Sequence, residues 1–302
     1  MTAPAFVRSL AARARRRVTL AAVAGLGLLA ALETAVALVA PYRAPRPQDW
    51  QAAAAWVKAE HQDRDLMVAA PAWADPVLRQ HLGDLLPPQI AARMDHQSYA
   101  RVWELSQRGA KAPETAGAHL RKERTFGNLR VRLYDRDELP LIYDFLDNWA
   151  HARVFRVESG GKVVPCQAQP GQHQCPDIGW NFVKRQLLEI GNSLRLGLYA
   201  QPVKNATLAI EYPDIPLGRE LAVGAGLHNV WLRKAGTGTV WMRVLVGGQE
   251  VGRFESTNRT GWKVMRMPTP AFAGKSGTVR FEITSEEPFA RHFGFAAEAR
   301  GL

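Results

Sequence analysis

A continuous apolar segment over residues 18–40 constrains this chain more than any other feature. Its 23 residues contain a single charged side chain, Glu33. A helix of that length crosses the roughly 30 Å of hydrocarbon in a bilayer. Arginines cluster before the segment, which predicts a cytoplasmic N-terminus and export of the chain that follows. They are Arg8, Arg13, Arg15, Arg16 and Arg17.

We therefore expect a single-pass anchor in the cytoplasmic (inner) membrane, with the C-terminal domains periplasmic or extracellular. A cleaved signal peptide is the alternative, because "AVALVA" ends in small residues. Pro41 follows directly and the apolar run exceeds a typical signal core, which favours an uncleaved segment. Glu33 is costly in lipid unless it is protonated near the interface or contacts a partner transmembrane helix.

The rest of the chain divides into two parts of different character. Helical and strand patterns interleave over 49–145, which predicts a small α/β domain. Short alternating runs such as "ATLAIEY" and "TVWMRVLV" fill 146–302 and predict an antiparallel β-sandwich of jelly-roll type. The expected fold class is thus α+β multi-domain. Its ranges are a basic cytoplasmic tail (1–17), a transmembrane anchor (18–40), an extended Pro-rich linker (41–48), the α/β domain (49–145) and the sandwich (146–302).

The opening of the first domain carries the clearest pattern. "DWQAAAAWVKAE" predicts a helix, because its apolar residues recur at the spacing of one helical face. They are Trp50, Ala53, Ala54 and Val57. Asp49 lies near the expected helix start, where a carboxylate is favourable. The run "LMVAA" then predicts a short strand covered on both faces.

Later segments of this domain predict two more helices and a strand. The helices are expected over 76–86 and 98–107. In "GNLRVRLYD" the apolar residues alternate with Arg130, Arg132 and Tyr134, which predicts a strand with one exposed, basic face.

Charge and cysteine usage narrow the partners. The formal net charge is +11, of which the five arginines in 1–17 supply +5, so the remainder carries +6. That surplus suits an anionic surface such as lipid head groups or acidic glycans, and no nucleic-acid-binding motif is present. Cys166 and Cys175 predict a disulfide in an exported domain. Free thiols are an alternative, while a metal site with His173 would lack a fourth ligand.

Residues 41–90 carry a resemblance to a known family. "DWQAAAAWVKAEHQDRDLMVAAPAWADPVLRQHLGD" resembles the start of the extracytoplasmic soluble domain in polyprenyl-phosphate-dependent membrane glycosyltransferases of the protein-mannosyltransferase type. Those enzymes catalyse with acidic residues on loops between many transmembrane helices. This chain has one apolar segment of membrane-spanning length, so those loops have no counterpart here. The resemblance implies a retained periplasmic domain and no retained reaction. The second half is similar in pattern to galactose-binding-like jelly rolls, which often bind carbohydrate.

Two short stretches of the second half carry the candidate ligand-binding residues. "GLHNVWLRK" combines a ring, an amide and cations, as sugar sites do, and "ARHFGF" adds a guanidinium and an imidazole. The alternative for each is an ordinary packed aromatic or a solvated cation. The candidates are His228, Asn229, Trp231, Arg233, Arg291 and His292.

Acidic residues and histidines are dense in one part of the first domain. A carboxylate pair there could act as general acid and base, but the spacing matches no catalytic or metal motif. We therefore predict no catalytic residue, no metal site and no cofactor. The group comprises His81, Asp84, Asp95, His96 and Glu104.

The sequence thus favours a membrane-anchored, extracytoplasmic binding or scaffold protein of the cell envelope without catalytic activity. Its ligand is expected to be a glycan or a partner subunit. Two alternatives stay open: a glycan-active enzyme that uses acids of the first domain, and a structural subunit of a membrane complex that contacts its partner through Glu33.

Overall fold

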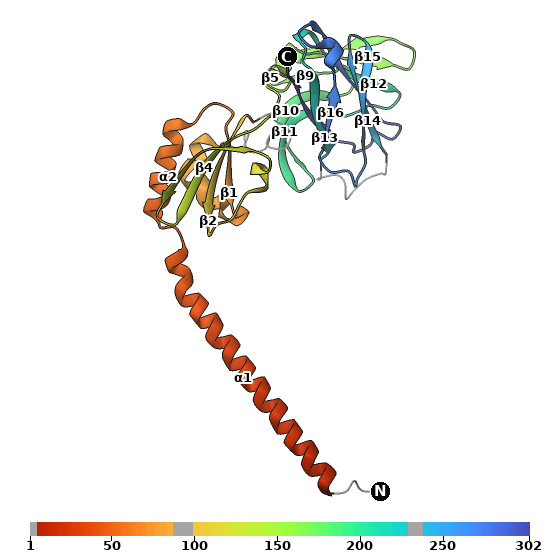
Figure 1. Cartoon of the computed structure of the whole chain (residues 1–302). Helices are drawn as coiled ribbons and strands as arrows, with labels where there is room; N and C mark the ends of the chain where they lie inside the picture. Colours follow the sequence, from red (N-terminus) through yellow and green to blue (C-terminus); the bar gives the residue numbers. More distant parts are fainter. Residues whose placement is uncertain (1–4, 87–98, 229–237) are drawn as a thin grey trace.

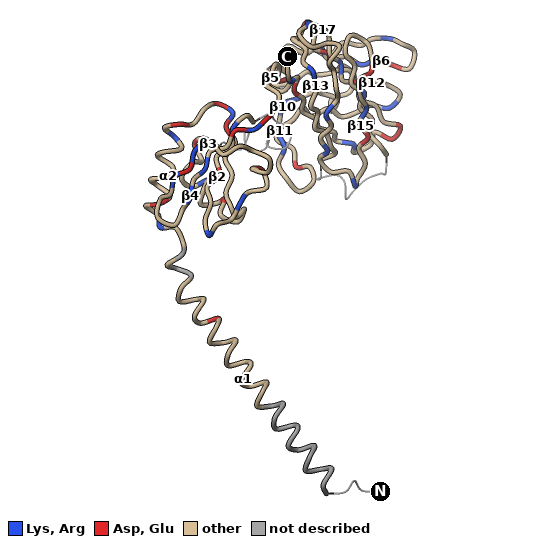
Figure 2. Tube along the Cα trace, viewed as in Figure 1, with Lys and Arg blue, Asp and Glu red and all other residues tan. Residues whose placement is uncertain are grey.

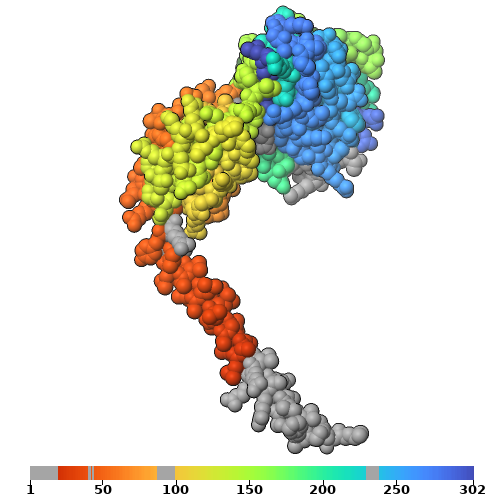
Figure 3. Space-filling model, in the orientation of Figure 1, coloured from red at the N-terminus to blue at the C-terminus, as the bar shows by residue number. Residues whose placement is uncertain are grey.

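A long helix leads into two folded units in the computed structural model of the chain (Figure 1). The structure describes residues 5–86, 99–228 and 238–302, apart from the side chains of 5–19, 40, 41 and 43. Helix α1 (Ala5–Arg43) contains an apolar stretch, Leu20–Val39, with a mean hydropathy of 2.1. None of its residues is buried against the rest of the protein. By length and composition this stretch suffices for a membrane anchor or a signal sequence. Figure 3 shows the helix projecting uncovered from the rest of the protein.

The connection after α1 is shorter than predicted. The linker was expected to be extended over 41–48, but α1 continues to Arg43 and α2 begins at Pro47. Asp49 accepts a hydrogen bond from the backbone N–H of Arg46 at 2.9 Å, which closes the start of α2. Only residues 44–46 therefore separate the two helices.

The first unit is a mixed four-stranded sheet with helices packed against it. Its strand order is β1-β2-β4-β3, with β1 and β2 parallel and the other pairs antiparallel. The elements are α2 (Pro47–Glu60), β1 (Leu66–Ala70), α3 (Asp75–Leu82), β2 (Arg101–Gln107), β3 (His119–Phe126) and β4 (Leu129–Asp135). Short 3-10 helices cover Ala72–Ala74, Gly83–Leu85 and Pro113–Thr115. The predicted apolar face of α2 is buried, and "LMVAA" forms β1 as expected.

Two predictions for this unit are wrong. Residues 98–107 were expected to be helical, but 101–107 form the central strand β2, whose seven residues are all buried. Arg101 and Glu104 are buried on Asp65 and Arg132, and their spacing of three residues imitates the polar face of a helix. The exposed basic face of β4 is also wrong for two of its three residues. Arg132 and Tyr134 are buried, and Arg132 donates to the buried carboxylate of Glu104 at 2.6 Å.

The second unit is a β-sandwich, as predicted. One sheet has the order β16-β13-β18-β11-β10-β9-β8, with β5 also paired to β18, and the other has the order β15-β14-β17-β12-β6-β7. The strands of the first sheet are β5 (Leu141–Asp144), β8 (Gln167–Gln169), β9 (Gln172–Gln174), β10 (Phe182–Ile190), β11 (Ser193–Ala200), β13 (Glu220–Leu227), β16 (Lys263–Pro268) and β18 (Phe293–Arg300). Those of the second are β6 (Arg153–Glu158), β7 (Val163–Pro165), β12 (Ala206–Pro216), β14 (Val240–Val246), β15 (Gln249–Ser256) and β17 (Ser276–Thr284). Single 3-10 turns cover Trp149–His151 and Pro270–Phe272.

The sandwich core is largely aliphatic with a cluster of aromatic rings, and a disulfide links two segments at one edge of the sandwich. Phe145 lies 5.0 Å from Tyr212 and 5.2 Å from Phe281, measured between ring centroids, with edge-to-face geometry. The predicted disulfide between Cys166 and Cys175 is confirmed and encloses the β8–β9 hairpin. It constrains a short loop of the unfolded chain, which contributes about 2–3 kcal/mol.

An ion-pair network joins the two units. Arg64, in the turn before β1, donates to Glu298 of β18 at 2.6 Å and lies 3.6 Å from Asp144. Glu298 also pairs with Arg300 at 2.9 Å, and the side chains of Glu298 and Arg300 are each 1% exposed. Figure 2 shows charged segments of both signs where the units meet. The buried carboxylate thus compensates cations from both units.

We expect Glu298→Gln to lower the free energy of unfolding by about 3 kcal/mol, because it removes the buried carboxylate that pairs with Arg300 at 2.9 Å and with Arg64 at 2.6 Å. Urea denaturation of the full-length protein in detergent would measure the change. Glu250→Gln is the matched control, since Glu250 pairs with Arg243 at 2.7 Å on the surface and exposed pairs contribute little. Equal effects of the two substitutions would contradict a buried role for Glu298.

Candidate functional site

Three strands of the larger sheet meet at one end of the sandwich. Strand β13 ends at Leu227, which pairs with Phe293 at the start of β18, and Tyr199 of β11 pairs with Gly294. His228 follows β13 and His292 precedes β18, and the backbone N–H of His228 donates to the carbonyl of His292 at 2.8 Å. The register therefore brings these two predicted candidates together.

A buried tyrosine extends this pair into a polar cluster. The hydroxyl of Tyr199 donates to Oε1 of Gln201 at 2.6 Å and lies 2.7 Å from Nδ1 of His292. A hydroxyl has one proton, so Nδ1 of His292 must carry the hydrogen that the hydroxyl accepts. Nε2 then carries no hydrogen while His292 is neutral. We call His228, His292, Tyr199 and Gln201 the histidine cluster.

Burial sets the protonation of the cluster. It lowers the pKa of His292, and the nearby His228 lowers that pKa further. Burial also lowers the pKa of His228, against a smaller raising effect of Glu189. The pKa of Tyr199 is raised by burial. At neutral pH the cluster is therefore uncharged, and it presents hydrogen-bond donors and acceptors rather than a fixed charge.

The loop before β18 carries a buried arginine and an exposed aromatic ring. Arg291 is 1% exposed and donates to Oδ1 of Asn258, so its guanidinium is held between the β15–β16 and β17–β18 connections. Ala290 has φ +53°, a left-handed conformation that turns the chain. Phe289 precedes it with 78% of its surface exposed. Polar groups and an exposed aromatic side chain are the side-chain types that contact a hydroxyl-rich ring.

The other predicted site residues are placed as follows. Asn229, Trp231 and Arg233 lie outside the described residues. The side chain of Glu33 is exposed on α1 within Leu20–Val39, and its contact with a partner helix stays a prediction.

Sequence reasoning missed Tyr199, Gln201 and Phe289. Tyr199 and Gln201 are two residues apart at the end of an alternating strand, which places them on one face. That spacing was a usable signal. Phe289 lies in the polar stretch "EEPFAR", where an isolated aromatic gives no pattern.

The acidic group of the first unit does not form a constellation in the described parts of the chain. Asp84 pairs with Lys58 at 2.8 Å on the surface, and Glu104 is committed to Arg132 and to the backbone N–H of Ala112. His81 stacks on Trp50 at 6.1 Å. Asp95 and His96 lie outside the described residues. Among those that are described, no three His, Cys, Asp or Glu side chains gather as metal ligands.

No protein family and no curated protein matches the chain. Among solved structures, the M60 catalytic domain with the CBM51-1 and CBM51-2 domains of Clostridium perfringens ZmpB is similar at 15% identity. The match covers 41% of this chain and 14% of that one, with a TM-score of 0.33. The CBM51-2 and INT domains of the same protein match at 16% identity, over 41% of this chain and 29% of that one, with a TM-score of 0.32.

A third similar structure is the CBM51 of Clostridium perfringens GH95 in complex with methyl-galactose. It matches at 16% identity over 38% of this chain and 81% of that one, with a TM-score of 0.28. The chain spans less than a third of the length of the first two structures. At such scores and identities we draw no conclusion on function from the likeness.

The histidine cluster should make stability depend on pH. Folding lowers the pKa of His228, His292 and also His173, so the unfolded chain takes up protons first as the pH falls through about 6.5. The stabilisation is present above that pH and is lost below it, by at most about 1.4 kcal/mol per pH unit for each histidine.

Urea denaturation at several pH values between 5 and 7.5 would measure this slope in wild type and in His292→Gln. We expect a shallower slope in the variant, because one of the three histidines no longer titrates. His81→Gln is the control, since His81 lies in the other unit. Equal slopes in wild type and His292→Gln would show that His292 is not protonated differently in the two states.

Proposed function

We propose that this protein is a membrane-anchored glycan-binding protein of the cell envelope, without catalytic activity of its own. Helix α1 crosses the cytoplasmic membrane with its N-terminus inside, and the two folded units lie in the periplasm or outside the cell. The sandwich binds glycan at the end that carries the histidine cluster. The resemblance of residues 41–90 to glycosyltransferase soluble domains is consistent with this placement and adds no reaction to it.

The observation that carries the proposal is the histidine cluster at the end of the sheet, with the exposed Phe289 three residues before His292 in the chain. Sugars present an apolar C–H face to aromatic rings and hydroxyls to planar polar groups. Tyr199, Gln201 and His292 are fixed by hydrogen bonds to one another, so little side-chain entropy is lost when a ligand binds. The positive charge outside the N-terminal tail favours an acidic glycan.

Binding should depend on the exposed ring. We expect Phe289→Ala to weaken the affinity of the full-length, detergent-solubilised protein for an acidic envelope polysaccharide about tenfold, because the stacking surface is lost. Calorimetry or an immobilised-glycan assay would measure it. Phe289 is exposed, so the substitution leaves the core unchanged.

Val163→Ala serves as the control. It removes an apolar side chain that is 58% exposed on β7 of the opposite sheet and should leave the affinity unchanged. No binding by wild-type protein at millimolar glycan would refute the glycan assignment, whatever the variants do.

The anchor has its own test. The full-length protein should stay in the membrane pellet after an alkaline carbonate wash, because Leu20–Val39 is long enough to span the hydrocarbon. In spheroplasts, added protease should degrade the folded units and spare an N-terminal epitope tag. Recovery of a shortened protein in the soluble fraction would instead establish a cleaved signal sequence.

A further inference from the structure

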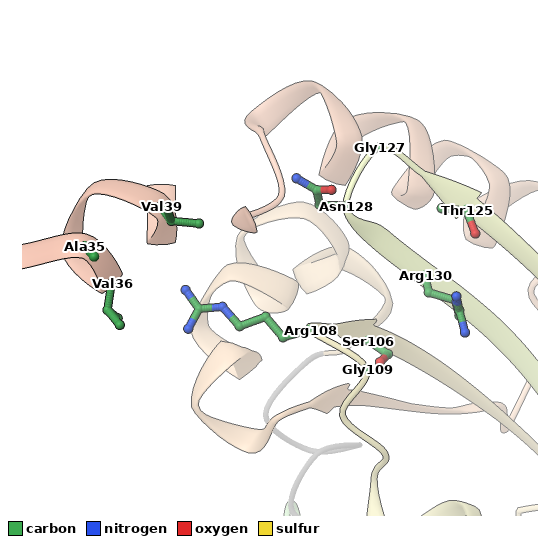
Figure 4. Close-up of a pocket in the computed structure, with 10 residues that line it drawn as sticks. All are labelled: Ala35, Val36, Val39, Ser106, Arg108, Gly109, Thr125, Gly127, Asn128 and Arg130. Carbon is green, nitrogen blue, oxygen red and sulfur yellow. The ribbon is translucent and has the colours of Figure 1, made fainter. Parts of the chain in front are cut away.

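A groove of about 710 Å³ lies between α1 and the first unit. One wall is apolar and consists of Ala35, Val36 and Val39 of α1 (Figure 4). The opposite wall is polar and comes from the turn after β2 and from the β3–β4 hairpin. Its larger side chains are Arg108, Asn128 and Arg130. The groove is thus amphipathic across its width.

The turn after β2 aims one arginine across the groove. Arg108 and Gly109 have φ values of +55° and +73°, and the N–H of Ala110 donates to the carbonyl of Gln107 at 3.1 Å. This is a type I′ turn, in which a non-glycine residue at Arg108 is uncommon. Figure 4 shows the guanidinium of Arg108 extending toward α1. Its Cζ lies 6.0 Å from the ring centroid of Trp73, which is 63% exposed.

The β3–β4 hairpin fixes the other side of the groove to the end of α1. Nδ2 of Asn128 donates to the carbonyl of Tyr42 at 2.8 Å. Gly127 has φ +54°, and a Cβ at that position would lie 2.4 Å from the carboxylate oxygens of Asp49. Only glycine permits this approach of the hairpin to the start of α2. The hairpin therefore contacts the end of α1 through Asn128 and the start of α2 through Gly127.

The position of the groove along α1 indicates what surrounds it. Ala35, Val36 and Val39 lie in the last turns of the apolar stretch Leu20–Val39. Twenty residues of helix span about 30 Å, so these turns reach the boundary between hydrocarbon and head groups. The exposed Trp73 beside the groove belongs to the residue type enriched at that boundary. The molecules present at this depth are bilayer lipids.

The positive charge of the groove favours anionic lipids over neutral ones. Its lining includes two arginines and no acidic residue in the described parts of the chain. Arg108 has no carboxylate within ion-pair distance among the described residues, and Arg130 lies 3.8 Å from Glu123 with both side chains well exposed. Such a pair contributes little, so Arg130 can turn to a phosphate. Arginine binds phosphate oxygens with paired, parallel hydrogen bonds.

We propose that this groove binds the phosphate head group of an anionic phospholipid of the bilayer that α1 crosses. Arg108 and Arg130 hold the phosphate, and the acyl chains lie along Val36 and Val39. The inference rests on the membrane anchoring proposed above and is independent of glycan binding. It gives the first unit a function of its own, which is to bind a lipid head group at the membrane surface.

The test uses the full-length protein in nanodiscs made from equal amounts of phosphatidylcholine and phosphatidylglycerol. Native mass spectrometry of the released protein counts the lipids of each kind that stay bound. We expect wild type to retain phosphatidylglycerol preferentially and Arg108→Asn/Arg130→Gln to lose that preference, by roughly fivefold for each cation removed. Asparagine at position 108 keeps the left-handed backbone and removes only the charge.

Arg121→Gln/Lys122→Gln is the matched control. It removes two half-exposed, ion-paired cations from the far end of β3 and should keep the preference. An equal loss in control and groove variants, or equal retention of the two lipids by wild type, overturns the proposal. Displacement of the bound lipid by soluble glycerol phosphate also overturns it, because the occupant would then be a free phosphoester.

A carbonate wash of the membranes from which the protein is purified distinguishes failure of the anchor from failure of lipid binding. Protein that is released by carbonate refutes the anchor and the groove assignment together. Protein that stays in the pellet but shows no lipid preference refutes the groove assignment and leaves the anchor intact. Binding of glycan is measured separately and is not affected by either result.

Discussion

The ion pair between Arg64 and Glu298 is the interaction that places the two units relative to each other. It joins the turn between α2 and β1 to the middle of the larger sandwich sheet, where β18 lies between β13 and β11. Its carboxylate is buried and is shared with Arg300. Arg64 is half-buried and also lies 3.6 Å from the buried carboxylate of Asp144, so a shift of one unit against the other would separate buried carboxylates from a cation that compensates them.

Strand β18 therefore has two roles at its two ends. Its C-terminal half carries Glu298 and Arg300 and is tied to the first unit, and β5 pairs along the same half. Its start follows Arg291 and His292, where three strands of the sheet converge. The candidate site thus lies on a strand whose position is fixed from the other end. In Figure 1 the sandwich lies farther from α1 than the four-stranded sheet does, so the site is remote from the groove between α1 and the first unit.

Much of this architecture could be predicted because its signals are local. The helix of Trp50 and Val57, the strand after it, the disulfide and the succession of short strands each depend on spacing within a few residues. Strand β2 could not be predicted in this way, because its polar residues Arg101 and Glu104 are buried against partners in other elements. Arg132 was expected in solvent because its partner Glu104 lies on a different strand. The approach of His228 to His292 depends on the pairing register of β13 and β18, which one sequence does not encode locally.

The short connection between α1 and α2 has a mechanical consequence. Asn128 donates to the carbonyls of Tyr42 and Ala44, and Asp49 accepts from the N–H of Arg46. The helix and the first unit should therefore move as one rigid body. In a bilayer thinner than its apolar stretch, a transmembrane helix tilts to match the hydrocarbon thickness. If α1 spans a membrane as proposed, the tilt would pass to both folded units, and a change in bilayer thickness would redirect the distant end of the sandwich. The thickness of the bilayer would then set the angle at which the sandwich is oriented to the membrane surface.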